Sequence, residues 1–525
     1  MKLVVAVVVA GTSLAVAQPK KDPWAADPVK VVSPPLKGPP AELGTEITVP
    51  PIPTFEIVQG ANGRKTVQEL RVNPKQHLGG VIEVEGTVTW VYDCVDTLRR
   101  KGQTRAQVQK RIDADPTLCE RAKFYLGDAK TTAPAGSLWV VDVPRPPNKL
   151  EKERLPKEDL AKWPAVPKVA VGDRVIVTGT FALASPHNER NSDGLLVFRA
   201  VAPAPASTAG GTRTAPPQPP KTQPFVRKKV ERHPADVAAS RDSIKLSNEC
   251  VRSYGQKQYD DAIAKCNEAV KRWGGNHIAY YALAGAHIGK NDWAAGRDAF
   301  DQAVSLAPDE PMYLMLYGRA VYETIVAAER GAEAKRQNAD PAQVDVDLSK
   351  VDFSKALAPL QRAAQLEPKL WRAHYYLGRI YRDQGFPSAA ATFLRQAIVE
   401  GAGEAAPFIA LGELYRKWDF PKEASDIALL GTARLTGLES SDVWYVLGMA
   451  YDDQRDDKLA IQAFTQALAA KPDNVKALFQ RGQAYFRQKD KKRARGDLDA
   501  FVKSADPSLT FALQMAHKML VDLGR

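Results

Sequence analysis

The sequence L-G-R-I-Y at residues 377–381 returns as L-G-E-L-Y at 411–415 and as L-G-M-A-Y at 447–451. The leading leucines are 34 and then 36 residues apart. Each stretch is followed by an alanine-centred apolar segment, and apolar residues at helical spacing indicate amphipathic helices. A period near 34 residues with two such helices in each unit predicts a stack of helix–turn–helix repeats in the C-terminal half of the chain.

Small side chains recur where the two helices of a unit would cross. Gly378 is followed twelve residues later by Ala390, and the same pairing of glycine with alanine recurs in later units. A larger side chain at either position would push the helices apart, because helix interfaces are closely packed. Prolines, which cannot continue a helix, follow several second helices. These prolines are Pro308, Pro368, Pro472 and Pro507.

This pattern of glycine, alanine and proline positions resembles the tetratricopeptide repeat family. The resemblance implies an α-helical solenoid of about seven units in residues 241–525, with a curved face that binds other proteins and rarely carries chemistry. A final helix, roughly from Leu509 to Leu523, would cap the open end. The units are expected to start near Ser243, His277, Pro311, Trp371, Ala405, Ser441 and Val475.

The third unit departs from the pattern by an insertion at about 322–354, between its first and second helices. The inserted sequence is rich in alanine, glutamate, lysine and arginine before it turns polar near Asn338. We predict an extended first helix followed by a loop. The insertion is either a tolerated addition to the surface or a protrusion that contacts the partner.

Upstream of the repeats, five segments have the alternating or apolar pattern of β-strands. A long excursion follows the first strand, and a helical segment precedes the fourth. Residues 56–203 are therefore predicted to form a small all-β barrel. The predicted strands are Val81–Tyr92, Lys123–Leu126, Ser137–Val143, Gly172–Phe181 and Leu195–Val201.

The sequence V-G-D-R-V-I-V-T-G-T-F at 171–181 resembles the fourth strand of the oligonucleotide/oligosaccharide-binding barrel, the OB-fold. In that barrel a Gly-Asp turn precedes the strand. A glycine within the strand, here Gly179, relieves crowding where the strand bends. The resemblance implies an OB-like barrel in front of the repeats.

Barrels of this kind bind ligands on one face and between loops, through aromatic and cationic side chains. Trp90, Tyr92, Phe124 and Arg174 are available for this role. Trp90 and Tyr92 share a face of their strand, however, so they could equally belong to the core or to an interface.

The first residues indicate export. Residues 1–17 have the features of a secretory signal peptide, with Lys2, an apolar run and small residues at 15–17. No later stretch is long and apolar enough to predict a transmembrane segment in the mature chain. A short signal of this kind on a repeat protein fits a bacterial periplasm or cell surface. Prolines concentrate in an extended, poorly ordered segment at 18–55 and in a basic linker at 204–240.

The net charge of +12 indicates, for an exported protein, an acidic partner, an anionic polymer or a membrane surface rather than nucleic acid. A polymer could bind at the barrel or at the basic linker, or the charge could simply aid solubility. The four cysteines form two local pairs, Cys94 with Cys119 and Cys250 with Cys266. An even number of cysteines in an oxidising compartment permits disulfides, and we predict both.

Sequence motifs for catalysis are missing. The seven histidines are scattered, and no histidine or cysteine pair has the spacing of a zinc site. The sequence has no phosphate-binding loop, no nucleophile elbow and no dinucleotide fingerprint. We therefore predict that the protein is not an enzyme and has no cofactor or metal.

In tetratricopeptide arrays the first helix of each unit lines the concave face, and the resemblance selects the residues there by their position in the unit. The selected surface is basic at its centre, with aromatic residues and methionines between the arginines. Guanidinium groups bind carboxylates at two points, so we predict an extended, partly acidic peptide in this groove. An unoccupied, solvated cationic face is the alternative. The predicted groove residues are Met312, Met315, Arg319, Tyr322, Arg372, Tyr375, Arg379, Arg382, Arg416, Lys417, Tyr445 and Phe479.

Two functions fit the sequence. In the first, the protein is an exported periplasmic or envelope scaffold that binds partner proteins through the concave groove of its repeats. In the second, the OB-like barrel binds an envelope polysaccharide or another polymer, and the repeats serve assembly.

Overall fold

The structure, a computed structural model, describes residues 49–72, 74–99, 102–129, 136–187, 189–205, 212–232, 237–341, 344, 346–506 and 509–524. The predicted signal peptide and most of the first proline-rich segment lie outside the described residues. The described residues all belong to one compact unit, which contains both a barrel and a helical array.

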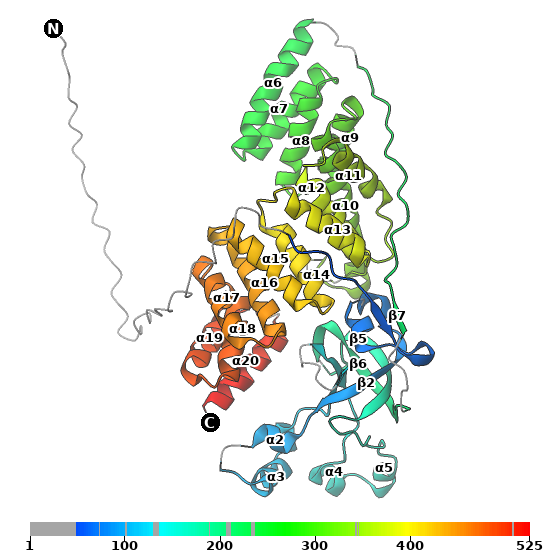
Figure 1. Cartoon of the computed structure of the whole chain (residues 1–525), viewed down its shortest axis with the longest axis vertical. Helices are drawn as coiled ribbons and strands as arrows, with labels where there is room; N and C mark the ends of the chain where they lie inside the picture. The colour runs from blue at the N-terminus through cyan, green and yellow to red at the C-terminus, as the bar shows by residue number, and fades with distance from the viewer. Residues whose placement is uncertain are drawn as a thin grey trace, which may run out of the picture. The chain divides into compact units, whose positions relative to one another are not determined.

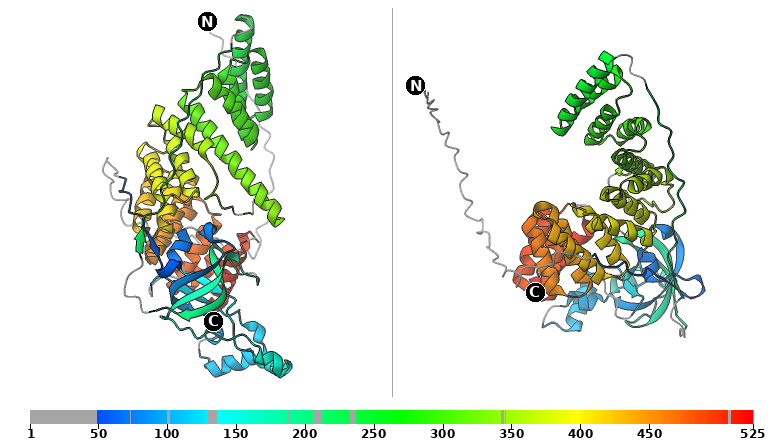
Figure 2. Two further views of the ribbon diagram at one scale, coloured as in Figure 1. Left: turned by 90° about the vertical axis from the view of Figure 1, so that its right-hand side faces the viewer. Right: turned by 45° about the horizontal axis from the view of Figure 1, so that its top comes forward.

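The C-terminal half of the chain is a helical array. Within the described residues, α6 to α19 form seven consecutive helix pairs, and α20 follows the last pair. Figures 1 and 2 show the pairs stacked in chain order, from the green α6 to the red α20. The helices are α6 (Val237–Gly255), α7 (Tyr259–Arg272), α8 (His277–Gly289), α9 (Trp293–Leu306), α10 (Pro311–Gln337), α11 (Ser354–Leu366), α12 (Trp371–Asp383), α13 (Pro387–Val399), α14 (Ala405–Lys417), α15 (Pro421–Arg434), α16 (Ser440–Asp453), α17 (Asp457–Ala470), α18 (Val475–Arg487), α19 (Lys491–Ser504) and α20 (Thr510–Leu523).

The helix boundaries agree with the predicted repeats. The first helices α8, α10, α12, α14 and α18 begin at the residues predicted as unit starts. α16 begins one residue early at Ser440, and α6 begins at Val237 rather than at Ser243. The third unit has the long first helix that the insertion predicts, since α10 spans 27 residues. The predicted α-helical solenoid with a capping helix is therefore confirmed.

Close crossing of the two helices in a unit depends on glycine. A Cβ built on Gly378 would lie 2.6 Å from Cγ of Leu394 and 3.0 Å from the main-chain oxygen of Ala390. One built on Gly448 would lie 2.4 Å from the ring of Phe464. Cβ atoms do not approach other atoms so closely, so any larger residue would separate α12 from α13 and α16 from α17. The predicted contact of Gly378 with Ala390 is confirmed.

The described part of the loop after α10 packs on the array. Val346 lies in a small apolar cluster with Ala334 of the helix. Phe353 is fully buried, with its ring centre 5.4 Å from that of Tyr322. The side chain of Gln384, at the end of α12, donates a hydrogen bond of 3.1 Å to the main chain of the loop. The insertion therefore lies against the first helices α10 and α12.

The upstream part contains a closed five-stranded barrel, with the strand order β2-β3-β4-β6-β5 among the described residues. β5 pairs with β2 and closes the barrel. Neighbouring strands are antiparallel, except that β4 and β6 are parallel. All five predicted strands are present. They are β2 (Val81–Val91), β3 (Phe124–Gly127), β4 (Leu138–Val141), β5 (Arg174–Ala184) and β6 (Arg190–Pro203).

Strand β5 bends at Gly179, as the sequence predicts. The register of β5 with β6 shifts between Thr178 and Gly179. A Cβ on Gly179 would lie 2.6 Å from both Cγ of Leu196 and the main-chain oxygen of Val197. Strand β6 passes too closely for any side chain at this position, which explains the glycine.

Apolar side chains from the strands fill the barrel, including Leu126 and Phe181, and a short helix packs against them through Val67 and Leu70. Two helical excursions also leave the barrel, one between β2 and β3 and one between β4 and β5. The helices of this part are α1 (Val67–Val72), α2 (Cys94–Leu98), α3 (Arg105–Ala114), α4 (Lys149–Arg154) and α5 (Lys157–Ala161).

The segments that enter and leave the barrel meet in a short ribbon. β1 (Ile57–Gln59) pairs antiparallel with β7 (Thr212–Thr214). Arg213 of β7 forms an ion pair of 2.9 Å with Glu56 beside it. From this ribbon one arm of chain runs towards residue 49 and a second arm runs from residue 215 to 232, and each contacts the array.

The first arm is anchored by an aromatic side chain. The ring centre of Phe55 lies 5.2 Å from that of Trp418 and 5.6 Å from that of Phe420, at the turn between α14 and α15. Arg395 of α13 donates hydrogen bonds of 2.9 Å to the main-chain oxygens of Val49–Pro50. The end of the first proline-rich segment is thus extended but held by specific contacts, because it offers an aromatic anchor and free carbonyl groups.

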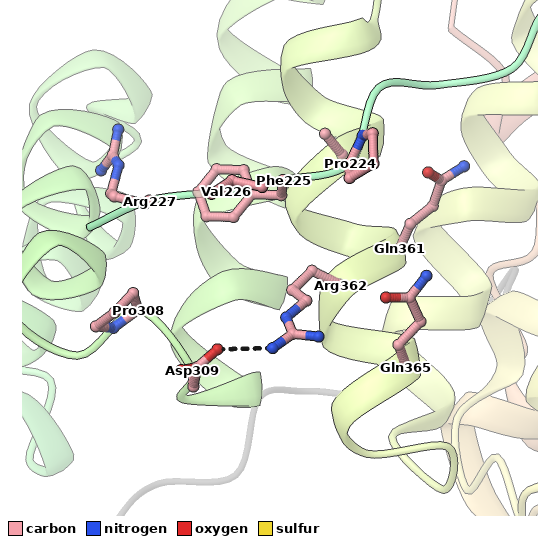
Figure 3. Close-up of a pocket in the computed structure, with 10 residues that line it drawn as sticks. Pro224, Phe225, Val226, Arg227, Pro308, Asp309, Gln361, Arg362 and Gln365 are labelled. Carbon is pink, nitrogen blue, oxygen red and sulfur yellow. Dashed lines mark hydrogen bonds and ion pairs between the residues drawn. The ribbon is translucent and has the colours of Figure 1, made fainter. Parts of the chain in front are cut away.

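The second arm lies along the second helices of the first units. Arg227 forms an ion pair of 2.8 Å with Asp301 of α9, and its guanidinium lies 5.7 Å from the ring centre of Tyr317. Figure 3 shows residues 224–227 passing beside Arg362 of α11, and a hollow of about 330 Å³ lies there. The second arm therefore contacts mainly the second helices, with Tyr317 of α10 as an added contact on a first helix.

Both predicted disulfides are present. Cys94 bonds to Cys119 and closes the excursion that carries α2 and α3. Cys250 bonds to Cys266 and joins α6 to α7, in the first helix pair of the array.

We expect the double substitution Cys250→Ala and Cys266→Ala to destabilise the first helix pair by about 3 kcal/mol, because the bond closes a short loop in the unfolded chain. Helix pairs contact only their neighbours, so faster hydrogen exchange should concentrate in α6 and α7 and spare α18 and α19. Unchanged exchange in α6 and α7 would contradict the prediction. So would four reactive thiols in the unfolded, unreduced protein, since the cysteines would then be free.

Candidate functional site

The first helices present most of the predicted groove residues on one face of the array. We call the surface formed by these residues on α10, α12, α14, α16 and α18 the groove face. Arg379 of α12 reaches Glu323 of α10 at 2.7 Å, and Arg416 of α14 reaches Asp453 of α16 at 2.6 Å. Successive first helices are therefore joined by side chains across this face.

The arginines of the groove face are largely neutralised by carboxylates of the same chain. All but one of these ion pairs join residues of different units. The pairs therefore hold neighbouring first helices together and leave less free positive charge than the sequence suggests. They are Arg372 with Glu404, Arg379 with Glu323, Arg382 with Asp383, and Arg416 with Asp453.

These arginines remain charged although they are partly buried. Burial alone would lower the pKa of Arg379, but the neighbouring Tyr322 and Glu323 raise it overall. Burial would likewise lower the pKa of Arg382, and Asp383 raises it. Removing a carboxylate from such a pair would leave a half-buried charge without compensation, which is strongly destabilising.

Several apolar residues of the predicted groove belong to the core. Met315 and Tyr322 are each 1% exposed, and Phe479 is 9% exposed and lies against Phe501, with ring centres 4.8 Å apart. Tyr322 donates a hydrogen bond to Asp383 and packs on the insertion loop. These three side chains hold the helices together and are not accessible to a partner.

Other predicted residues are accessible. Met312, Tyr375 and Tyr445 are half-buried, and Lys417 is exposed. The ring of Tyr375 lies edge-on to that of Tyr376, with centres 5.1 Å apart. The groove face thus offers half-buried aromatic rings between ion pairs.

A hollow of about 340 Å³ lies at the centre of the groove face. Arg382, Asp383, Glu413 and Lys417 supply charges of both signs to its wall. The insertion loop and the α1 region of the barrel complete it. The residues from those two parts are Asp347, Ser349, Val72, Pro74 and Gln76.

Arg319 is held differently from the other arginines of this face. Its guanidinium lies 5.1 Å from the ring centre of Trp293 and 5.3 Å from that of Tyr376. Its Nε is buried without a hydrogen-bond partner. Among the ion pairs of the described residues, none involves Arg319.

Three aromatic residues form a row across the barrel strands. Trp90 of β2, Tyr125 of β3 and Trp139 of β4 are cross-strand neighbours. The ring centres are 4.7 Å apart for Trp90 and Tyr125, and 5.6 Å for the stacked pair Tyr125 and Trp139. All three are half-buried and alternate with core residues such as Phe124, which is 1% exposed.

The four barrel residues proposed from sequence as ligand contacts therefore have different roles. Trp90 is in the aromatic row, whereas Phe124 lies inside the barrel and cannot contact a ligand. The hydroxyl group of Tyr92 accepts a hydrogen bond of 2.8 Å from the main-chain N–H of Glu120. Arg174 is paired with Glu85 at 2.7 Å.

Sequence reasoning missed the residues that complete the site. Glu323 and Asp383 lie twelve residues after their unit starts, as Lys417 does, but they were left out of the predicted set; Glu404 lies just before α14, and Trp293 begins a second helix. Tyr376 also carried a signal, because it follows the predicted Tyr375 directly. The residues that the insertion loop and the barrel add to the hollow could not be predicted, because the repeat spacing does not say where those two parts pack on the array.

A family model described as "Tetratricopeptide repeat" matches residues 342–407 and 428–509, and a second model with the same description matches 253–320. These segments are tetratricopeptide repeats, and their stack is a scaffold suited to protein–protein interaction. A search of curated proteins found no match.

Solved structures of similar fold include a chain of the APC/C hetero-tetramer Cut9-Hcn1, with 13% identity and a TM-score of 0.38; the similarity covers 53% of this chain and 49% of that chain. PilF of Pseudomonas aeruginosa has 14% identity and a TM-score of 0.35, over 46% of this chain and 96% of PilF. A tetratricopeptide repeat protein from Parabacteroides merdae has 11% identity and a TM-score of 0.36, over 54% of this chain and 100% of that protein.

The buried tyrosines of the first helices predict sensitivity to alkali. Burial raises the pKa of Tyr313 and of Tyr376 to about 12. In the unfolded chain the same phenols ionise near pH 10. Their contribution to stability is therefore complete below pH 10 and is lost as the pH rises towards 12.

We expect the melting temperature, followed by circular dichroism, to fall between pH 10 and pH 12. Each tyrosine should cost on the order of 1 to 3 kcal/mol over this range. The variant Tyr376→Phe should show a shallower fall, because its ring cannot ionise. A melting temperature that stays constant up to pH 12 would contradict this account.

Proposed function

We propose that this tetratricopeptide repeat protein is an exported scaffold of the bacterial envelope that binds a protein partner along its groove face. The observation that carries the proposal is the hollow at the centre of that face. Its walls come from the array, the insertion loop and the barrel, so an occupant would contact all three parts. The charges of both signs on its wall suit the polar groups of an extended peptide segment.

The proposed compartment rests on two features. Residues 1–17 are predicted to be a signal peptide, and both cysteine pairs are disulfide-bonded. Disulfides persist in oxidising compartments such as the bacterial periplasm and the cell surface. In the part of the chain that the structure describes, no helix combines the length and apolarity needed to cross a membrane.

The proposed partner is a protein with an extended, partly acidic segment. The groove-face ion pairs remove most of the free positive charge, so simple attraction to a basic surface is not the main support. The half-buried Arg319, towards the N-terminal end of the face, takes part in none of the ion pairs of the described residues. Cations fixed on rigid helices favour carboxylates of the partner at defined positions.

A second candidate function places the binding site on the barrel. The row formed by Trp90, Tyr125 and Trp139 favours it, because flat aromatic surfaces bind sugar rings and other planar or apolar groups. The strand order of the closed barrel, with β4 parallel to β6, supports the OB-like assignment proposed from sequence. In this case the ligand is an envelope polysaccharide or another polymer.

The basic end of the second arm is a weaker site for an anionic polymer. Arg227 is engaged with Asp301, and Arg232 donates a hydrogen bond of 3.2 Å to the main-chain oxygen of Gly274. Lys228 and Lys229 are exposed. Because Arg227 and Arg232 hold the arm on the array, only part of the positive charge of this segment is available to bind a polymer.

Photo-crosslinking in the native envelope tests the scaffold function. A benzoylphenylalanine at the exposed position of Glu413, on the groove face, should give a light-dependent adduct with a partner protein. The same residue in place of Lys422, exposed on the second helix α15, is the matched control and should give none. Adducts at Lys422 but not at Glu413 would contradict the proposal, and so would adducts at neither position.

Sedimentation with purified envelope polysaccharide tests the barrel function. The double variant Trp90→Ala and Tyr125→Ala should lose most of its binding, because each stacked ring contributes about 1 to 3 kcal/mol in comparable sites. Trp163→Phe, in the excursion between β4 and β5, is the control and should bind as before. Equal sedimentation of the double variant, with an unchanged melting temperature, would remove the barrel from consideration.

A further inference from the structure

The described arginines of the groove face fall into two classes. Arg372, Arg379, Arg382 and Arg416 each have a carboxylate partner in the chain. Arg319, on α10, is instead flanked by two aromatic rings. A pairing that is repeated along the face but is missing at one residue points to a specific role for that residue.

The rings that flank Arg319 are themselves fixed. Trp293 donates a hydrogen bond of 2.9 Å from Nε1 to the side chain of Asn291, and its main-chain oxygen accepts one of 3.3 Å from Thr324. Tyr376 is only 7% exposed and lies on α12. The guanidinium is therefore positioned by contacts from three units before any partner arrives.

Contact with two rings orients the hydrogen-bonding groups of Arg319. An aromatic ring attracts a guanidinium group by a cation–π interaction that does not use its N–H groups. The Nε of Arg319 is nevertheless buried without an acceptor. Such a donor is rare in folded proteins and calls for an explanation.

The charges around Arg319 favour an anionic ligand. The carboxylate one helical turn away is Glu323, and it is engaged with Arg379 at 2.7 Å. Asp383, farther along the face, is engaged with Arg382 and accepts a hydrogen bond from Tyr322. Glu323 therefore balances Arg379, the described residues show no ion pair for Arg319, and the local excess is positive.

We propose that Arg319 binds a side-chain carboxylate, of aspartate or glutamate, in the extended segment of the partner. The inference rests on the proposed scaffold function. It names the contact by which the groove face would select partner segments that carry an acidic residue. A carboxylate accepts two parallel hydrogen bonds from the edge of a guanidinium group, a geometry that lysine cannot reproduce. The half-buried Trp293 and Tyr375 would receive an apolar residue next to the acidic one.

Selection from a random heptapeptide phage library against the mature protein tests this inference. Peptides selected on the wild type should carry Asp or Glu at one fixed position. Selection on Arg319→Gln should lose that preference. Arg297→Gln, on the second helix α9 and outside the groove face, is the matched control and should keep it.

Fluorescence anisotropy with one selected peptide and its amide twin, Glu replaced by Gln or Asp by Asn, measures the contact. On the wild type the twin should bind roughly tenfold more weakly or worse, as for the loss of a charged hydrogen-bonded contact. On Arg319→Gln the two peptides should bind alike. Arg319→Lys should recover only part of the difference, which a purely structural role of this side chain would not produce.

The outcomes separate this inference from the proposed function. Peptides that compete for the groove face but show no acidic preference, or keep it on Arg319→Gln, would overturn the role of Arg319 and leave the scaffold function standing. If every selected peptide binds both the Glu413→Arg and the Arg319→Gln variants as well as the wild type, the groove face is not the binding site and both proposals fail. Thermal melts identify a misfolded Arg319→Gln variant, and Arg319→Met, which keeps an apolar stem between the rings, then replaces it.

Discussion

The close crossing of the two helices in each repeat is the constraint on which the rest of the structure depends. Where Gly378 and Gly448 lie, a single added carbon would meet a neighbouring side chain at 2.6 Å and 2.4 Å. Because the pairs pack so closely, they stack in chain order and turn their first helices to one face. The positions of the groove-face side chains follow from this stacking, and so do the ion pairs that connect one first helix to the next.

Those ion pairs change how the basic character of the sequence should be understood. Reversing the charge of Arg379 or Arg382 would place a carboxylate against Glu323 or Asp383, and so would disturb the array as well as any partner contact. Much of the positive charge on this face is thus structural. The two arms also hold the chain on the array, through Phe55 at the turn between α14 and α15 and through Arg227 on α9.

The repeat pattern predicted the array well because L-G-x-x-Y marks both the helix and its crossing point. The strands could be predicted from the alternation of apolar and polar residues. The bend could be predicted from Gly179, where the structure leaves no room for a side chain. The anchoring of Phe55 could not be predicted, since a single aromatic residue in a proline-rich segment has no periodicity. The pairing of Arg379 with Glu323 was equally hidden, because spacing tells which face a residue lies on but not which carboxylate it meets. The choice of this face as the binding site therefore stays a prediction, and the repeat positions could not separate core residues such as Met315 from accessible ones.

The central claim is that a partner occupies the groove face. Hydrogen–deuterium exchange of the mature protein, alone and with the partner captured from its own envelope, tests it most directly. The account predicts slower exchange in α10, α12 and α14 and in the insertion loop when the partner is bound, with no change in β2, β3 and β4. Protection confined to those strands, with the first helices unchanged, would contradict it and assign binding to the barrel.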